Sequence, residues 1–185
     1  MHLTKSLLTM SQIAAFTLFF LGVSTRVVAD LPPAIQAKVD KGLKDLAAWA
    51  ADPEIVKAVK EANGKKGIEG MTNGKWEELT VKDAPVVTLL TNVTSQKMLA
   101  WGKSAGFQKL MLRDKDAYIV AASEKPLLYN NATRPQFKSP LEGTLFAAKE
   151  IKPDPTTQAK SVQIGVSVKD GETVIGVLHA GVSVD

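Results

Sequence analysis

The chain contains no cysteine and only two histidines among its 185 residues. The absence of cysteine excludes disulfides, thiol nucleophiles, cysteine-ligated zinc, iron–sulfur clusters and covalently attached c-type haem. Beyond the first 29 residues the sequence has a single histidine, His179, which excludes a histidine-rich metal site. We therefore expect no metal and no cofactor, and a fold stabilised by the packing of its core alone.

Runs of like charge and low-complexity segments are also absent. The sequence has 23 basic and 19 acidic residues. Without Lys5 and Arg26, which lie in the N-terminal segment, the excess of positive charge falls from four to two. No basic stripe is interleaved with aromatic residues, so the sequence does not predict nucleic-acid binding.

The N-terminal segment has the pattern of a secretory signal peptide. Lys5 precedes an apolar run, residues 13–23, which is shorter than the roughly 20 residues of a membrane-spanning helix. Small residues follow at the position where a signal peptidase cleaves. We predict a signal peptide over residues 1–29, cleaved between Ala29 and Asp30, with no membrane span left after cleavage. The predicted location is periplasmic or secreted, and the alternative is a retained N-terminal anchor.

The first half of the remaining chain has helical periodicity. Apolar residues from Ile35 to Ala47 recur at helical spacing. Asp52 and Pro53 are typical of a helix N-cap and of the first helical position, and Asn63-Gly64 would end this second helix. A third, short helix is predicted over residues 95–101, ending at Gly102.

The second half changes to the short apolar segments of β-strands. Polar turns separate these segments, which predicts two hairpins and one further strand. The intervening residues 126–140 have few aliphatic side chains and are predicted to form a loop. Helices followed by strands indicate one α+β domain, residues 30–185, with long N-terminal helices packed on a roughly five-stranded antiparallel sheet. The candidate strands are residues 107–112, 117–122, 144–149, 162–168 and 173–184.

The last hairpin has two possible registers. A two-residue turn at Asp170-Gly171 would place His179 beside Val162. A bulged turn would instead move the His179 side chain to the other face of the sheet, because side chains alternate along a strand. The sequence leaves both registers open.

The order of several segments resembles the Cache family, whose members are bacterial extracytoplasmic sensor domains with a PAS-like fold. The resemblance covers roughly residues 31–184 and implies a PAS-like sheet and the binding of a small molecule. Its most specific part begins with an acidic turn and an Ala-Ser strand end, continues with a polar segment, and closes with an Asp turn and an Ile-Gly-Val-Leu strand. These segments are Leu112–Ser123, Tyr129–Asn131 with Phe137, Val166–Gly171 and Val174–Leu178.

Two features depart from the family pattern. Ala117 occupies a turn position where the family often has glycine, so this turn lacks the residue that most readily adopts a positive φ. The sequence ends at Asp185, with no transmembrane helix or signalling module after the closing strand. The resemblance therefore implies a stand-alone secreted form that acts through a partner, such as a membrane receptor or another protein. The long first helix could also pair with a second copy in a homodimer.

One polar segment carries most of the candidate ligand-binding residues. It combines an aromatic wall, amide groups and two cations, which suits a small carboxylate or an amino-acid-like metabolite. The alternative is an ordinary polar loop. Tyr118 and Arg113 on the adjoining hairpin are further candidates, as is His179 if its register turns it toward the ligand. The segment's candidates are Tyr129, Asn130, Asn131, Arg134, Phe137 and Lys138.

Two other functions remain as alternatives. Gly102–Gly106 matches the G-x-S-x-G pattern, which would pair Ser104 with His179 in a serine hydrolase. That motif requires a strand-to-helix turn, whereas here a helix precedes it and a strand follows, so we expect no enzyme. The second alternative is a ligand-free scaffold that binds a protein partner, which an apolar-filled pocket and an exposed apolar patch on the first helix would favour.

Overall fold

The computed structural model describes residues 31–155 and 157–184. The predicted signal peptide, residues 1–29, lies outside the described residues. The helices are α1 (Pro33–Ala50), α2 (Pro53–Asn63), α3 (Asn73–Glu78), α4 (Ala84–Thr91), α5 (Val93–Ala105) and α6 (Pro135–Leu141). The strands are β1 (Phe107–Asp114), β2 (Ile119–Ala122), β3 (Phe146–Ala147), β4 (Lys152–Pro153), β5 (Lys160–Asp170) and β6 (Thr173–Ser183).

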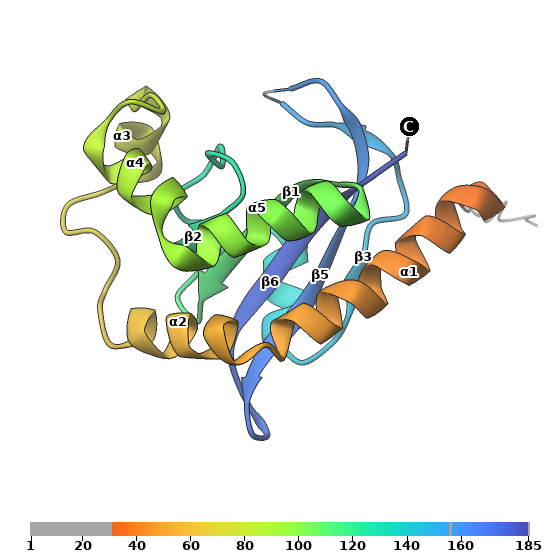
Figure 1. Cartoon of the computed structure of the whole chain (residues 1–185), viewed down its shortest axis with the longest axis horizontal. Coiled ribbons are helices and arrows are strands. Elements are labelled where there is room, and N and C mark those ends of the chain that lie inside the picture. Colours follow the sequence, from red (N-terminus) through yellow and green to blue (C-terminus); the bar gives the residue numbers. More distant parts are fainter. Residues whose placement is uncertain (1–30, 156, 185) are drawn as a thin grey trace, which may run out of the picture.

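One antiparallel sheet forms the centre of the molecule (Figure 1). Its strand order is β2-β1-β6-β5-β3, and the two-residue strand β4 also pairs with β5. The long hairpin β5–β6 lies in the middle of the sheet, with β1 paired to β6 on one side and β3 paired to β5 on the other. The predicted α+β class is confirmed, as is an antiparallel sheet whose main strands follow the helices.

The main core lies between the sheet and the N-terminal helices. α1 and α5 cross the same face of the sheet (Figure 1). Val39 and Leu46 of α1, Ile55 of α2 and Met98 of α5 are fully buried in one cluster with side chains of the strands. The strand side chains in this cluster are Leu110, Leu112, Val162, Ile164, Val166, Val168, Leu178, Ala180 and Val182.

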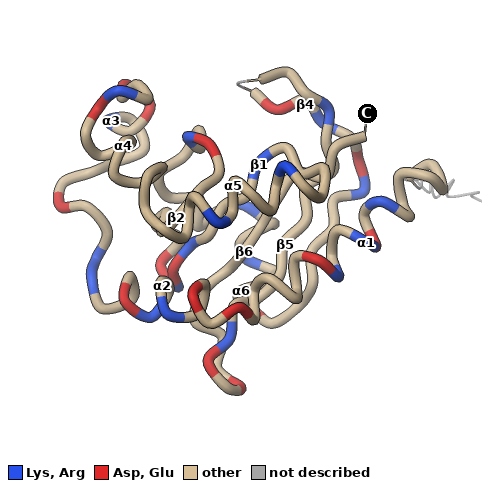
Figure 2. The backbone as a smooth tube through the Cα atoms, in the orientation of Figure 1, with Lys and Arg blue, Asp and Glu red and all other residues tan. Residues whose placement is uncertain are grey.

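Both long N-terminal helices begin as the sequence predicts. Pro33 and Pro53 occupy the first helical position, where the missing N–H costs no hydrogen bond. The Asp52 side chain caps α2 by accepting from the Glu54 backbone N–H at 2.9 Å. Lysines and acidic residues are interspersed along α1 and α2 (Figure 2). Among the described residues no helix is both long enough and apolar enough to cross a membrane.

The helix predicted over residues 95–101 is longer than expected. α5 continues through Gly102 and ends at Ala105, followed by Gly106 with a φ of 74°. Gly102 is buried, and a Cβ there would lie 3.3 Å from Leu110 Cδ1. The prediction that Gly102 ends the helix is therefore wrong, because this glycine serves close packing against β1.

The sequence predicts a loop over residues 126–140, but the last part of this segment is helical. Residues 135–141 form α6, which packs on β5 and β6 on the face of the sheet opposite α1. Pro135 occupies the first turn of this helix, where proline is favoured. A Cβ at Gly165 of β5 would lie only 2.6 Å from the Gln136 carbonyl oxygen, so glycine permits this close approach.

The last hairpin has a two-residue turn at Gly171-Glu172 and a bulge within its strands, which differs from both predicted turns. Asp170 pairs with Thr173, and the register shifts between Val168 and Lys169. His179 consequently pairs with Gly165 and not with Val162. Leu178 on the same strand faces the main core, so the His179 side chain points to the opposite face of the sheet.

The turn of the first hairpin places a non-glycine residue at positive φ. Ala117 has a φ of 70° and is fully buried. The Asp114 carboxylate supports this turn by accepting from the backbone N–H groups of Asp116 and Tyr118. This turn therefore adopts the left-handed conformation without glycine.

Candidate functional site

A cavity of about 440 Å³ lies on the face of the sheet opposite α1. Its floor is formed by β1, β5 and β6, and its walls are residues 126–136 and 146–155. We call it the sheet cavity. Four of the residues predicted from the sequence line it, namely Arg113, Asn131, Arg134 and His179.

Arg113 is a buried cation at the inner wall of the sheet cavity. The side chain is 1% exposed. Nη1 donates to the carbonyl oxygens of Ala117 and Tyr129, each at 2.9 Å, and Nη2 donates to that of Leu128 at 3.0 Å. Nε donates to His179 Nε2 at 3.1 Å. These four bonds leave one of the five N–H groups, on Nη2, with no acceptor among the described residues.

The Arg113 guanidinium also lacks a directly paired carboxylate. Among the described residues no carboxylate oxygen lies within ion-pair distance of it. Burial lowers the pKa of Arg113 from 12.5 to about 9, and the nearby charge of Asp114 partly offsets that effect. The group therefore remains positively charged at neutral pH.

His179 is a buried, neutral imidazole of defined tautomer. Burial, and secondly the charge of Arg113, hold its pKa well below the usual value. Because the Arg113 Nε–H can only donate, Nε2 of His179 must be an acceptor. The proton of the neutral ring is then on Nδ1, which has no hydrogen-bond partner.

Asn131 lies beside His179 and has the complementary unmatched atom. Its amide nitrogen Nδ2 is 3.3 Å from His179 Nε2, and the acceptor role of Nε2 fixes this orientation of the amide. The carbonyl oxygen Oδ1 is buried and has no partner. His179 and Asn131, which both line the sheet cavity, thus carry an unmatched donor and an unmatched acceptor on atoms that are themselves buried.

Charged groups around the sheet cavity give it a net positive charge. Lys109 and Asp154 form an ion pair at 2.9 Å that is almost completely buried. An exposed pair, Lys152 and Glu150, lies at 2.6 Å. These two pairs balance, so the guanidinium groups of Arg113 and Arg134 leave the lining with a net charge of +2. Arg134 itself is exposed at the edge of the cavity.

The two predicted tyrosines face a different cavity. Tyr118 and Tyr129 line a space of about 490 Å³ between α2, α4 and β2. Their rings lie 5.4 Å apart, and Tyr129 lies 5.5 Å from Trp76. The Tyr129 hydroxyl accepts a hydrogen bond from the Ile68 backbone N–H, and burial raises its pKa. The tyrosine side chains therefore do not join Arg134 in the sheet cavity.

The remaining predicted residues support the walls of the sheet cavity or lie outside it. Asn130 donates to the Asp116 carbonyl oxygen at 2.7 Å and accepts from the Ala132 backbone N–H at 3.0 Å. Phe137 is buried against Ala117 and Val177, where it anchors α6 to β6. Lys138 is exposed on α6 and does not line the sheet cavity.

Sequence reasoning missed the buried pair Lys109–Asp154 and the polar residue Gln163. Lys109 precedes Arg113 by four residues on β1, so the alternation of side chains along a strand could have predicted that both lie on the same face. No local pattern predicts the position of Asp154, because it contacts Lys109 from a segment 45 residues away in the sequence.

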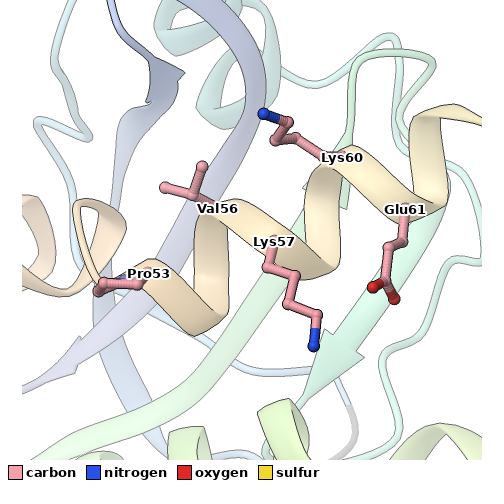
Figure 3. A pocket seen from close by; sticks show the side chains of 5 residues that line it. All are labelled: Pro53, Val56, Lys57, Lys60 and Glu61. Atoms are coloured by element: carbon pink, nitrogen blue, oxygen red, sulfur yellow. The ribbon is translucent and has the colours of Figure 1, made fainter.

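A third hollow is confined to the surface of α2 (Figure 3). It measures about 480 Å³ and is lined by Pro53, Val56, Lys57, Lys60 and Glu61. The lining comes from one helix, and Lys60 forms an ion pair with Asp170 at 2.7 Å. This hollow has no set of polar groups converging from several elements.

Ser104 and His179 do not form a catalytic pair. Ser104 is exposed near the end of α5, and its hydroxyl donates to the Trp101 carbonyl oxygen at 3.0 Å. α5 packs on the same sheet face as α1, whereas His179 points to the other face. The serine-hydrolase alternative therefore lacks the contact that it requires.

Comparison with known proteins identifies the fold. No family model matches the sequence, and no curated protein is detectably similar to it. The sensor domain of the Vibrio cholerae histidine kinase DctB is 13% identical, with a TM-score of 0.56 over 82% of this chain. The chain spans 53% of that domain.

The sensor domain of Escherichia coli DcuS is 13% identical, with a TM-score of 0.53 over 80% of this chain and 90% of that domain. The isoleucine-bound sensory domain of the Campylobacter jejuni chemoreceptor Tlp3 is 11% identical, with a TM-score of 0.42 over 83% of this chain and 64% of that domain. With the strand order above, the DctB and DcuS likenesses show that this chain has the fold of the Cache, or PDC, type of sensor domain.

Proposed function

We propose that this chain is a sensor-type domain that binds a small carboxylate-bearing molecule in the sheet cavity. The proposal includes export to the periplasm or the exterior, with residues 1–29 removed as a signal peptide and residues 30–185 forming the single mature domain. The ligand-dependent shape of the domain would be presented to a partner protein, such as a membrane receptor. Pairing of two copies through α1 is part of the same proposal.

The observation that carries the proposal is the unmatched chemistry of the sheet cavity. Arg113, His179 and Asn131 lie together, and one guanidinium N–H, the imidazole Nδ1–H and the amide oxygen have no partner among the described residues. Leaving such groups unpaired costs roughly 1–3 kcal/mol each, so a fold retains them most readily where a ligand completes them. The net positive lining favours an anion.

Each residue of the site has a distinct proposed role. Arg134, exposed at the edge, would grip the ligand carboxylate through two parallel N–H donors. Arg113 would supply positive potential and its remaining Nη2–H from the inner wall. His179 and Asn131 would contact the part of the ligand that reaches deepest. Asn130, Tyr129 and Phe137 would act indirectly, by holding the wall in place.

The scaffold alternative has less support. It would be favoured by a cavity filled with apolar side chains, whereas the sheet cavity has charged and amide groups on its walls. An apolar patch on α1 would also favour it, but the exposed residues of α1 include charges of both signs (Figure 2).

A thermal-shift screen of the purified protein against small mono- and dicarboxylates tests the proposal. A ligand at a hundred times its dissociation constant adds about 2.7 kcal/mol of stability, which corresponds to roughly 5 to 10 °C in Tm. We expect Arg134→Gln to abolish the shift. Lys138→Gln is the matched control, because it removes a nearby exposed cation that does not line the cavity, and we expect it to retain the shift. Equal effects of both substitutions, or no shift with any acid, would contradict the proposal.

A further inference from the structure

Asp114 is a buried carboxylate that faces away from the sheet cavity. It follows Arg113 on β1, and because side chains alternate along a strand, the guanidinium and the carboxylate lie on opposite faces of the sheet. Asp114 lines the space of about 490 Å³ between α2, α4 and β2, which we call the second cavity. Figure 1 shows β2 between these two helices. A volume of this size is typical of a small-molecule site.

One oxygen of the Asp114 carboxylate is open to a ligand, although the residue is only 2% exposed. Oδ1 accepts from the backbone N–H groups of Asp116 and Tyr118, at 3.0 and 2.9 Å. Oδ2 has no hydrogen-bond partner among the described residues. It is also not one of the completely buried unmatched atoms, which are Asn131 Oδ1 and His179 Nδ1. Oδ2 therefore keeps some accessible surface at the wall of the second cavity.

The charge of Asp114 is poorly neutralised. Burial raises the pKa of Asp114 above its ordinary value of 3.8, although the two backbone donors and the charge of Arg113 act in the other direction. Among the described residues no cationic side chain lies within ion-pair distance of Asp114. The lining of the second cavity has a net charge of −1, from the acidic residues Glu54, Glu61 and Asp114 against Lys57 and Lys65.

The mouth of the second cavity has an apolar and aromatic surface. Ile68 and Val93 line it and are 43% and 72% exposed. The Tyr118 ring is partly exposed, and the almost fully buried rings of Tyr129 and Trp76 lie behind it. Exposed aliphatic side chains favour an apolar ligand, and the face of an aromatic ring attracts a cation.

We propose that the second cavity is a separate binding site for an organic ammonium ion with an apolar body. The ammonium N–H groups donate to Asp114 Oδ2, and the apolar body packs on Ile68, Val93 and Tyr118. This inference goes beyond the proposed function and does not depend on it, because the sheet cavity lies on the other face of the sheet and has a positive lining. The two cavities then select ligands of opposite charge.

Other ligand groups fit Asp114 less well. A carboxylate has acceptors only and would direct its lone pairs at Oδ2. A hydroxyl can donate one hydrogen bond but leaves the buried charge uncompensated, and a hydrogen bond between two charged groups is about twice as strong as a neutral one. Lys57 and Lys65 are exposed, so their attraction for an anion is weakened by water and salt.

Isothermal titration calorimetry of the purified protein at neutral pH tests the inference with two matched pairs of probes. The pairs are phenethylamine with phenethyl alcohol, and butylamine with butanol, so that only the polar group differs within a pair. In at least one pair we expect the amine to bind about tenfold or more tighter than the alcohol. No amine binding, or less than a tenfold advantage in both pairs, would overturn the inference. The proposed carboxylate site stands in either case, since acids test it separately.

Nuclear magnetic resonance of the unaltered protein locates the bound amine. We expect the largest shifts at the backbone amides of Ile68, Val93 and Tyr118. Shifts centred on Asn131 and Arg134 would place the amine in the sheet cavity and overturn the inference. Neither result depends on a variant that must fold.

A variant pair then assigns the affinity to its residue. Asp114→Asn should weaken amine binding about tenfold or more, while its remaining oxygen can still accept from the backbone N–H groups of the turn. Asp116→Asn is the matched control, because it removes the same charge two residues away from an exposed side chain that does not line the second cavity, and we expect less than a threefold change. Full amine affinity in Asp114→Asn, with the fold confirmed by circular dichroism, would overturn the inference.

Discussion

Arg113 brings a positive charge into the interior of the domain and fixes the chemistry of its neighbours. Its bonds to the carbonyl oxygens of Leu128 and Tyr129 hold the cavity wall against β1. Its bond to His179 sets the imidazole tautomer, and its charge helps keep that imidazole neutral. One side chain therefore positions the wall, orients the histidine and makes the cavity positive.

The neutral His179 predicts a specific dependence of stability on pH. Its pKa is depressed in the folded state, so below its ordinary value of 6.5 the unfolded chain binds a proton that the folded chain does not. The free energy of unfolding should therefore fall as the pH drops from about 7 to about 5, by up to roughly 1.4 kcal/mol per pH unit from this group. Urea unfolding across this range measures the slope.

His179→Gln provides the control for this slope. Glutamine can still accept from Arg113 but does not titrate, so the variant should show a shallower fall in stability over the same range. Asp114 acts in the opposite direction, because burial raises its pKa and its protonation favours the folded state in more acidic solution. Equal slopes for the two proteins above about pH 5 would contradict a buried neutral histidine.

At the scale of elements, the β1–β2 turn combines strain with burial. Ala117 adopts a left-handed conformation that costs a non-glycine residue about 1–2 kcal/mol, while its methyl group packs against Phe137 and Val177. The turn matters for the site, because the Ala117 carbonyl oxygen accepts from Arg113.

Replacing Ala117 by glycine should therefore change stability very little. Relief of the left-handed strain offsets the lost methyl burial and the greater freedom of the unfolded chain, so we expect a change within about 0.5 kcal/mol. Ala121→Gly is the control, since Ala121 is equally buried in the regular strand β2, and it should cost about 1–2 kcal/mol. Chemical denaturation compares the two, and an equal cost for both would show that the turn is unstrained.

The sequence was informative about elements that have a strong local signal. Pro53 after Asp52 predicted the start of α2, and alternation predicted β5 and β6. α6 was missed because Pro135 and Pro140 are typical of loops, although Pro135 is compatible with a first helical turn. The register of β5–β6 could not be predicted, since it depends on a bulge between Val168 and Lys169.

At the scale of the whole molecule, the two faces of the sheet differ in chemistry. α1, α2 and α5 bury the apolar face of the strands, while the opposite face carries Arg113, His179 and the other polar groups of the sheet cavity. Substitutions on the first face should act on folding, whereas replacement of an exposed residue at the edge of the second, such as Arg134, should act mainly on the proposed ligand.

Long-range packing explains why only part of the candidate site could be predicted. Arg113, Asn131, Arg134 and His179 line one cavity, and their part in binding a ligand stays a prediction. Tyr129 is only two residues from Asn131, yet its ring lies in the cavity beside α2 because its hydroxyl is bound by the Ile68 backbone N–H. No local pattern encodes that contact.

The most direct test of the central claim is to locate a bound carboxylate by nuclear magnetic resonance. Titrating the isotope-labelled protein with the tightest acid from the screen reports which side chains change their environment. The account predicts that the largest shifts occur at the Asn131 amide, the His179 ring and the Arg113 Nε–H, with little change at Tyr118, Trp76 and Thr88 around the second cavity. Shifts concentrated at Tyr118 and Trp76, with His179 unchanged, would contradict it.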